Sequence, residues 1–339
     1  MTKLKARVIT LGIVIPVKDQ FKELAVLLKS LTQLKRPANM KLGITVVNDG
    51  SNVAHTQQLE KLQSKGIQVI HNSSSRGFAF CVNQGCAKTP ADHCWILSPD
   101  SEFTSPLLLN TINHLCMEGH QLILGHEEIP ETSALDKMLN YRARKAGKLS
   151  PQQAIRRGNL VVNRNQFFAV GGFDVEMGNG ELLLQDFLRR FRETVIDEEI
   201  VVSDSLLVRR RKGLDLEAWL QTGYVDGESI SDSFYQRYPT YYGKSWYRWF
   251  DTYMNQGLSS HVVHWLHPFS LKHSGFVGRM AAHKYFPRPL LAATLHWLWL
   301  LRYFEGTQTR EQMFAESELA QEEVAQLADN RVEKTKHAA

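Results

Sequence analysis

The chain has 339 residues, 43% of them hydrophobic and 22% charged, which is the composition of a folded globular protein rather than a disordered or fibrous one. This length favours one large domain with an appendage, or two domains. The net charge of +5 suits an anionic substrate or membrane surface, but it lacks the dense basic patterning of a nucleic-acid-binding protein, so we expect no nucleic-acid partner.

The first half of the chain alternates strand-like and helix-like segments. Strands are predicted over residues 7–17, 42–49, 67–72, 93–100 and 121–128. Helices are predicted over residues 21–34, 54–66, 76–89 and 105–119, the last with Ser105 as its N-cap. This alternation predicts an α/β fold with a mostly parallel sheet and helices on both faces.

The regular alternation ends near residue 128. A helix is predicted over 135–147, then a strand, a short helix and a glycine turn within 158–174, an amphipathic helix over 180–193 and an edge strand over 199–211. We therefore expect one domain over residues 1–211. Most of the tryptophans follow it, which predicts a helical, aromatic-rich region over 212–315, with a polar helix and disordered tail over 316–339.

Four cysteines lie close together in the first half: Cys81, Cys86, Cys94 and Cys116. They form no CxxC pair and no paired histidine spacing accompanies them. This pattern predicts reduced, buried thiols rather than disulfides or a zinc site. The N-terminus begins like a signal peptide, but it continues as a β-branched run without a cleavage site, so a first buried strand is expected.

Residues 289–304 form the longest apolar run near the C-terminus. As a helix this run spans about 24 Å, which is short of the roughly 30 Å of a bilayer core. Trp297 and Trp299 with flanking Arg and Lys residues suit a membrane-surface helix. A core helix that packs on the rest of the protein is the alternative.

Ligands of parallel sheets bind at the carboxyl ends of strands, and polar residues gather at three such positions. They are "PVKDQ" after the first strand, "NDGS" after the second and "PDSE" after the fourth. In the last of these, Asp100 and Glu102 are separated by one serine and can share a divalent cation, or they belong to a polar turn.

Two further motifs carry residues suited to chemistry. Arg76 and Gly77 are the first residues of the helix predicted over 76–89, whose N-terminus would attract an anion. In "GGFDVEMGNGELLLQDF", either Glu181 or Asp186 can act as a general base, or both are surface acids paired with neighbouring arginines.

In this order, "IPVKD", "VNDGS", "RGFAFCVNQG", "PDSE", "GGFD" and "GELLLQD" resemble the motifs of bacterial family-2 glycosyltransferases of the GT-A fold, over roughly residues 10–210. The resemblance implies transfer of a sugar from a nucleotide-diphospho-sugar to an acceptor hydroxyl, usually with inversion. It also implies a Mg²⁺ or Mn²⁺ cofactor at Asp100 and Glu102. The implied nucleotide-sugar-binding residues are Pro16, Val17, Asp19, Asp49, Ser51, Arg76, Gly77 and Asn83. Gly171, Gly172 and Asp174 would shape the acceptor side.

The chain departs from the family pattern at three places. Asn48 replaces the first acid of "DDGS", and Glu102 replaces the second acid of D-x-D. The usual "ED" pair admits two alignments. One makes Asp186 the base; the other matches "DFLRR" to a downstream "DLxxR", which puts Leu183 and Leu184 at the base position and leaves Glu181 to serve.

The resulting expectation is an inverting hexosyltransferase in surface polysaccharide or glycolipid biosynthesis, with a glycan or lipid-linked acceptor. It would be cytoplasmic, with possible peripheral contact to the inner membrane face. One rival is a GT-A protein that binds nucleotide-sugar or glycan without turnover. The other, a sugar nucleotidyltransferase, is disfavoured because the first strand lacks a glycine-rich phosphate loop bearing Lys or Arg.

Overall fold

The computed structural model describes residues 8–145, 158–178, 180–213, 215–251, 265 and 287–310. The chain divides into two compact units. Unit 1 comprises residues 1–218 and 278–295, and unit 2 comprises residues 219–277 and 296–339. The first break therefore falls a little after the expected boundary at residue 211.

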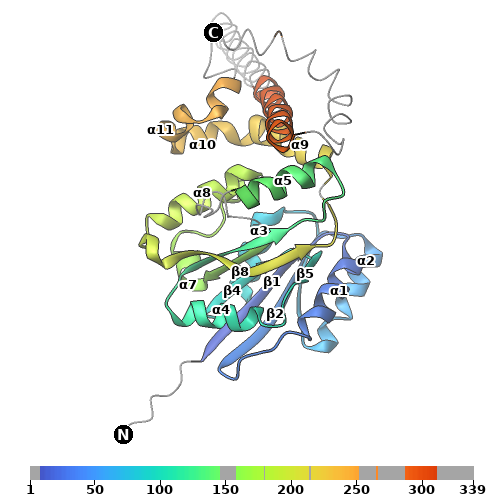
Figure 1. Ribbon diagram of the computed structural model, residues 1–339. Helices are drawn as coiled ribbons and strands as arrows, with labels where there is room; N and C mark the ends of the chain where they lie inside the picture. The colour runs from blue at the N-terminus through green and yellow to red at the C-terminus, as the bar shows by residue number, and fades with distance from the viewer. Residues whose placement is uncertain are drawn as a thin grey trace, which may run out of the picture. The chain divides into compact units, whose positions relative to one another are not determined.

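Unit 1 contains a sheet that has eight strands in the described part of the chain (Figure 1). The strands are β1 (Ile9–Val17), β2 (Met40–Asp49), β3 (Gln68–Asn72), β4 (His93–Leu97), β5 (Ser101–Phe103), β6 (Leu122–Glu128), β7 (Asn159–Asn163) and β8 (Ile200–Arg210). Their order is β3-β2-β1-β4-β7-β6-β8-β5. Strands β5 and β7 run antiparallel to their neighbours and the other pairs are parallel, so the expected mostly parallel sheet is confirmed.

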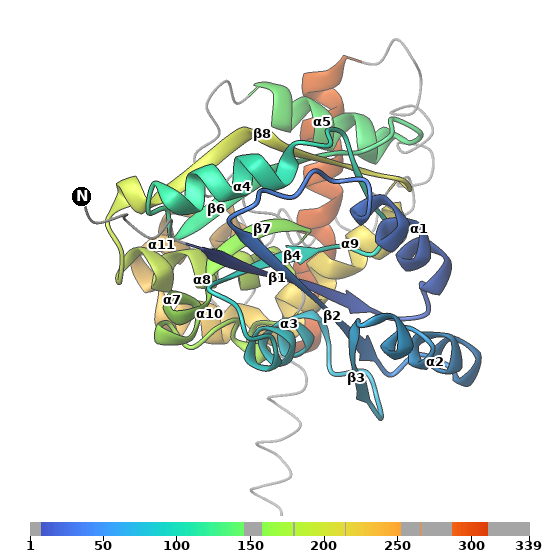
Figure 2. The same ribbon diagram turned by 90° about the horizontal axis from the view of Figure 1, so that it is seen from below.

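The helices of unit 1 cover both faces of this sheet. They are α1 (Phe21–Leu31), α2 (Val53–Glu60), α3 (Phe78–Lys88), α4 (Leu108–Met117), α5 (Ala134–Lys145), α7 (Arg164–Ala169) and α8 (Glu181–Arg192). Odd-numbered residues of β1, such as Ile13, are in the apolar cluster with α1 and α4. The even-numbered Val14 instead contacts α3 at Gly85. Because strand side chains alternate between faces, α4 and α3 lie on opposite sides of β1 (Figure 2).

Three local predictions need correction. Strand β8 is not an edge strand, because it lies between β6 and the three-residue strand β5, which was not predicted. Strand β4 ends at Leu97 rather than at residue 100. The N-cap of α4 is Leu107 rather than Ser105, although the Ser105 hydroxyl still accepts a hydrogen bond from the Leu107 amide at 3.2 Å.

Unit 2 is helical where it is described. Its elements are α9 (Leu216–Val225), which begins in unit 1, a π-helical segment (Asp226–Ile230), α10 (Ser231–Arg237), α11 (Pro239–Lys244) and the short 3₁₀ helix η5 (Trp246–Phe250). Residues 288–310 are also helical, and those from His296 onward belong to this unit. The expected polar tail over 316–339 lies outside the described residues.

The apolar run over residues 289–304 is mostly buried. Leu295, Trp299 and Phe304 are at most 3% exposed, and Trp297 contacts the Phe250 ring edge-on at 5.2 Å between centroids. These contacts favour the core-helix interpretation over the membrane-surface one.

In the described part of the chain, no helix is both long enough and apolar enough to cross a membrane. All four cysteines are buried and free, as expected of reduced thiols.

Candidate functional site

The three polar loops of the sequence analysis emerge at one edge of the sheet. Strand β1 pairs in parallel with β2, where Val17 lies opposite Asn48, and with β4, where Val14 lies opposite Ile96. Because β2 and β4 both run parallel to β1, the carboxyl ends of these three strands lie at the same edge of the sheet. The residues after Val17, after Asp49 and after Leu97 therefore follow neighbouring strand ends.

The loops after β1 and β2 are tied to each other. The Asp19 amide donates to the Ser51 hydroxyl at 3.0 Å, and the Asn52 amide donates to the Asp19 carboxylate at 2.8 Å. Asp19 has φ of 53°, a left-handed conformation that is uncommon outside glycine. These reciprocal bonds hold the two loops as one preformed wall.

Asn48, which stands where the family has its first acid, bonds to the loop after β2. It is 1% exposed, and its side-chain oxygen accepts from the Ser51 amide at 2.9 Å. Its amide nitrogen lies 3.1 Å from both the Thr56 hydroxyl and His71 Nδ1. An amide can both donate and accept, so Asn48 fits a position that bonds to three different groups.

Asp49 holds the start of α3 with its own carboxylate. Its oxygens accept from the Arg76 amide at 2.6 Å, the Ser75 hydroxyl at 2.8 Å and the Gly77 amide at 3.2 Å. Burial alone would raise the pKa of Asp49, but these hydrogen bonds outweigh it and lower the pKa. The amides of the helix N-terminus are thus engaged by Asp49, while the Arg76 side chain is exposed and lies over the Phe80 ring.

Asp100 lies at the third loop in a different setting. It is 3% exposed, and its Oδ2 accepts from Arg210 Nε at 2.8 Å. Its Oδ1 is buried and has no hydrogen-bond partner among the described residues. Arg210 also lies 4.0 Å from Glu127 Oε1. Burial opposes the charge on Arg210, but Glu127 and Asp100 outweigh burial and raise the pKa of the guanidinium.

The two acids of "PDSE" therefore differ in their surroundings. Glu102 is exposed on β5, where it lies opposite Arg209, whereas Asp100 is buried in the preceding turn. A buried carboxylate oxygen without a partner fits a hard divalent cation. No group of three metal-ligating side chains occurs among the residues that the structure describes, so water and a phosphate would complete the coordination of such an ion.

The glycine turn after α7 is held by Asn83 of α3. The Asn83 side chain donates to the Phe173 carbonyl at 2.7 Å and accepts from the Phe173 amide at 2.9 Å. Gly171 and Gly172 have φ of 83° and 68°, and a side chain on Gly172 would meet Asn83 at 2.7 Å. The carboxylate of Asp174 accepts from the Glu176 amide at 3.0 Å. Asn83 thus joins the predicted nucleotide wall to the predicted acceptor loop.

Asp186 is enclosed within the fold. It is 0% exposed, and its Oδ2 accepts from Arg190 Nε at 2.8 Å and Nη2 at 2.6 Å. Arg190 Nη1 in turn donates to the carbonyls of Val170 and Gly172. This ion pair links Asp186 to the glycine turn, and it leaves the Asp186 carboxylate buried rather than exposed to an acceptor.

This geometry favours the second of the two alignments, in which Asp186 and Arg190 match the downstream "DLxxR". Leu183 and Leu184 are then at the expected base position, and they are 0% and 7% exposed. Glu181 is the first residue of α8, but its side chain lies outside the described part of the structure.

Arg210 and Glu127 are site residues that the sequence reasoning missed. They come from the carboxyl ends of β8 and β6, which pair in parallel and end at the same sheet edge. The strand-end rule that selected Asp49 and Asp100 applies to them equally. The alternation over residues 199–211 predicts an edge strand, and such a strand carries no expectation that its end lies near Asp100.

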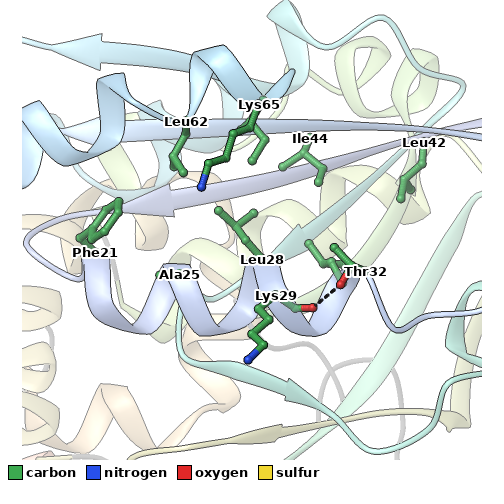
Figure 3. A pocket seen from close by; sticks show the side chains of 11 residues that line it. Phe21, Ala25, Leu28, Lys29, Thr32, Leu42, Ile44, Leu62 and Lys65 are labelled. Atoms are coloured by element: carbon green, nitrogen blue, oxygen red, sulfur yellow. Dashed lines mark hydrogen bonds between the residues drawn. The ribbon is translucent and has the colours of Figure 1, made fainter.

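A cavity of about 480 Å³ lies elsewhere in unit 1, between α1 and the earlier part of β2 (Figure 3). None of the predicted site residues lines it. Its walls are largely apolar and come from Phe21, Ala25, Leu28, Lys29, Leu31, Thr32, Leu42, Ile44, Leu62, Lys65 and Ile67. It is therefore distinct from the polar strand-end site.

Solved structures share this fold. The chain is similar to a mannosyltransferase from Pyrobaculum calidifontis in complex with GDP-Man and Mn²⁺, at 10% identity and a TM-score of 0.57, over 89% of this chain and 88% of that one. It is also similar to mannosyl-3-phosphoglycerate synthase from Rubrobacter xylanophilus, at 15% identity and a TM-score of 0.52, over 68% and 75%. At these identities the likeness shows the fold alone.

No curated protein sequence matches the chain. A family model does match it, namely the one described as glycosyl transferase family 2, over residues 12–175. That range begins in β1 and ends just after the glycine turn, so it includes all three strand-end loops. Residues 12–175 of this chain therefore match the model of glycosyl transferase family 2, and they lie on a sheet of the GT-A fold.

Proposed function

We propose that this protein transfers a hexose from a nucleotide-diphospho-sugar to an acceptor hydroxyl, with inversion at the sugar carbon. The observation that carries the proposal is the buried Asp100 carboxylate, whose Oδ1 has no partner among the described residues, at the sheet edge shared with two interlocked loops. The similar mannosyltransferase structure contains GDP-Man and Mn²⁺, which supports the same donor and cofactor classes here.

The donor side is formed by the carboxyl ends of β1 and β2 with the loops after them, and by α3 with the two residues before it. Pro16, Val17, Asp19, Asp49, Ser51, Arg76, Gly77 and Asn83 are its proposed residues. Asp19 and Ser51 lock two of the loops together, so the wall exists before the ligand binds and less conformational entropy is lost on binding. The exposed Arg76 guanidinium is available to an anionic ligand, whereas Asp49 acts by fixing the amides beside it.

Asp100 is the proposed ligand of Mg²⁺ or Mn²⁺, with Glu102 as a second ligand if its side chain turns toward the same edge. When bound, the ion would offset the negative charge on the departing diphosphate. Arg210 holds Asp100 Oδ2 and thereby aims Oδ1 away from itself. We assign Arg210 a positioning role at this site.

The acceptor side would be shaped by Gly171, Gly172 and Asp174. A single displacement needs a base that removes the acceptor proton as the sugar is transferred. Because Asp186 is engaged by Arg190, Glu181 is the better candidate for the base, and Asp186 positions the turn that holds the acceptor.

Replacing the two acids one at a time tests this assignment. Glu181→Gln should abolish transfer and donor hydrolysis while the protein still binds donor. Asp186→Asn, unlike Glu181→Gln, should lower the melting temperature, because it removes the charge that pairs with Arg190. Glu193→Gln, an exposed residue just after α8, is the matched control. If Glu181→Gln retains wild-type turnover, the base assignment is wrong.

A panel of nucleotide-sugars tests the function itself. We expect a UDP-, GDP- or dTDP-sugar to raise the melting temperature, and Mn²⁺ to enlarge the shift, since a ligand stabilises the folded state according to its concentration over its Kd. Asp100→Asn should remove the Mn²⁺ contribution. Failure of every nucleotide-sugar to shift the melting temperature would overturn the proposal.

A second candidate function is nucleotide-sugar or glycan binding without turnover. Two buried leucines, Leu183 and Leu184, at the family's base position favour it. The two candidates differ in one measurement. Donor binding with no transfer to any acceptor and no donor hydrolysis would support the binding protein.

The proposed setting is the synthesis of a surface polysaccharide or glycolipid in the cytoplasm, at the inner membrane face, with a glycan or lipid-linked acceptor. The net charge of +5 suits both an anionic donor and an anionic surface.

A further inference from the structure

Two tryptophans in unit 2 are largely exposed on one short helix. Trp246 is 71% exposed and Trp249 is 53% exposed, and both belong to η5. A 3₁₀ helix has three residues per turn, so these two indole rings lie on the same face of η5. Indole rings are among the largest apolar side chains, and exposing more than half of each of these two side chains is unfavourable unless another surface covers them.

The surroundings of these rings are cationic. Lys244 and Arg248 are exposed beside them, and the sequence contains no Asp or Glu between Ser233 and Phe250. The next acid, Asp251, is buried and bonded to Tyr242 and Arg310. The exposed part of η5 thus combines apolar rings with positive charge that no neighbouring acid of this segment offsets.

Two aromatic residues of segment 244–250 anchor it to the rest of unit 2. Phe250 is 3% exposed and packs against the Trp297 ring, and the Tyr247 ring lies 5.4 Å from that of Tyr303. The inner side of η5 is therefore part of the core of unit 2. Its outer side presents Trp246 and Trp249 from a fixed base, as an anchor requires.

We propose that this face of η5, formed by Lys244, Trp246, Arg248 and Trp249, docks on an anionic lipid bilayer surface. Tryptophan prefers the membrane–water interface, and each nearby Lys or Arg adds attraction to anionic headgroups. The exposed side chains include no acid or amide group to bond sugar hydroxyls, which favours a bilayer over a glycan. This contact site differs from the apolar run over 289–304, which is mostly buried.

Vesicle binding of the full chain tests the proposal. Wild-type protein should cosediment with phosphatidylcholine vesicles that contain phosphatidylglycerol, and much less with phosphatidylcholine alone. Trp246→Ala/Trp249→Ala should weaken this binding by at least about tenfold. Lys244→Gln/Arg248→Gln should weaken it by about fivefold for each cation removed, and added salt should have the same effect.

Two exposed apolar residues of unit 1 provide the matched control. Val53 and Ile196 are 73% and 63% exposed, and Val53→Ser/Ile196→Ser should leave vesicle binding unchanged. Melting temperatures of all variants check that the fold is retained. Brominated lipids should quench the wild-type tryptophan fluorescence, and the Trp246→Ala/Trp249→Ala variant should lose most of this quenching.

Several outcomes would overturn the proposal. One is absence of binding to anionic vesicles; another is equal binding by wild type and the double tryptophan variant. A dimer that the tryptophan substitutions dissociate, without vesicle binding, would assign the face to a second copy of the chain. Binding to dextran sulfate but not to vesicles would assign it to an anionic polymer. None of these readouts depends on glycosyl transfer, so they are separate from the tests of the proposed function.

Discussion

Each unit contains a buried carboxylate beside an arginine, Asp100 in unit 1 and Asp251 in unit 2, and the two differ in how completely they are bonded. In unit 1 the centre of the sheet is apolar, and buried Asp49 and Asp100 lie at its carboxyl edge. In unit 2 a buried cluster lies among the helices, where Asp251 accepts from the Tyr242 hydroxyl at 2.5 Å and from Arg310 at 2.9 Å. The two carboxylates differ in whether an oxygen remains available for a further hydrogen bond or a metal contact. Both oxygens of Asp251 are bonded, whereas Asp100 Oδ1 has no partner among the described residues.

This contrast separates a structural acid from a candidate ligand. A buried carboxylate with every oxygen bonded stabilises its surroundings and has nothing left to offer a ligand. Burial, followed by the proximity of Tyr303 and Asp251, raises the pKa of Tyr242, so its hydroxyl stays protonated and remains a donor. A buried carboxylate with one oxygen available carries an unfavourable desolvation that a bound cation would relieve.

The largest expected effect is in unit 2. Asp251→Leu should destabilise the protein by about 3–5 kcal/mol, because it leaves the Arg310 charge buried without its carboxylate. Urea unfolding measures the change. The double variant Asp251→Leu/Arg310→Met should recover most of the loss, since two apolar side chains leave no charge behind. A loss below about 1 kcal/mol in the single variant would contradict a structural role for this cluster.

Arg210→Gln in unit 1 should lower stability less than Asp251→Leu does, and its main effect should be on metal binding. Loss of the partner of Asp100 should lower stability by about 2 kcal/mol, a reduced value because Arg210 is partly exposed. It should also tighten Mn²⁺ binding without donor by at least about tenfold. Arg210 is bonded to the same carboxylate that would hold the ion, so its removal relieves a repulsion between two positive charges, which we expect to exceed the effect of the lost orientation of Asp100.

The neighbouring Arg209 is the matched control for Arg210. It pairs with Glu128 at 2.9 Å, but both side chains are substantially exposed, so Arg209→Gln should change stability by at most about 1 kcal/mol. Electron paramagnetic resonance of free Mn²⁺ measures metal affinity directly. Equal Mn²⁺ affinity in the wild type and Arg210→Gln would show that Arg210 does not govern the ion.

Asn83→Ala should lower stability by about 1–3 kcal/mol. It would remove both hydrogen bonds to Phe173 and leave a backbone donor and acceptor of the glycine turn without a side-chain partner. Because the turn belongs to the proposed acceptor side, KM for the acceptor should rise together with the loss of stability. Unchanged unfolding in urea would show that the turn is held by Arg190 alone.

Asp49→Asn should have the smallest effect, about 1–2 kcal/mol at neutral pH, and this effect should depend on pH. The folded pKa of Asp49 lies below its ordinary value of about 3.9. Its contribution is therefore present above that value and is lost as the pH falls through the lowered folded pKa. The stabilities of wild type and variant should converge in acid. A difference that grows below about pH 4 would contradict the assigned hydrogen bonds.

Much of unit 1 follows from local sequence patterns. The β-branched run before Pro16 predicts a buried strand, and the leucines at helical spacing in 21–34 predict a helix; both are confirmed as β1 and α1, with ends shifted by a few residues. The ordered motifs likewise predict the family. Hydrophobic periodicity is a relation between near neighbours, so no knowledge of the rest of the chain is needed.

What the tertiary structure decided is which polar groups meet. Asp100 and Arg210 are 110 residues apart, and Asn83 and Phe173 are 90 apart, and no local pattern links them. The three-residue strand β5 is too short to show any period, yet it takes the edge position next to β8 and places Ser101, the residue after Asp100, opposite Arg210. Sequence alone thus identified Asp100 as a candidate ligand. Its burial, its guanidinium partner and its one remaining oxygen depend on strand order, because hydrogen bonds form only between groups that the sheet brings within about 3 Å.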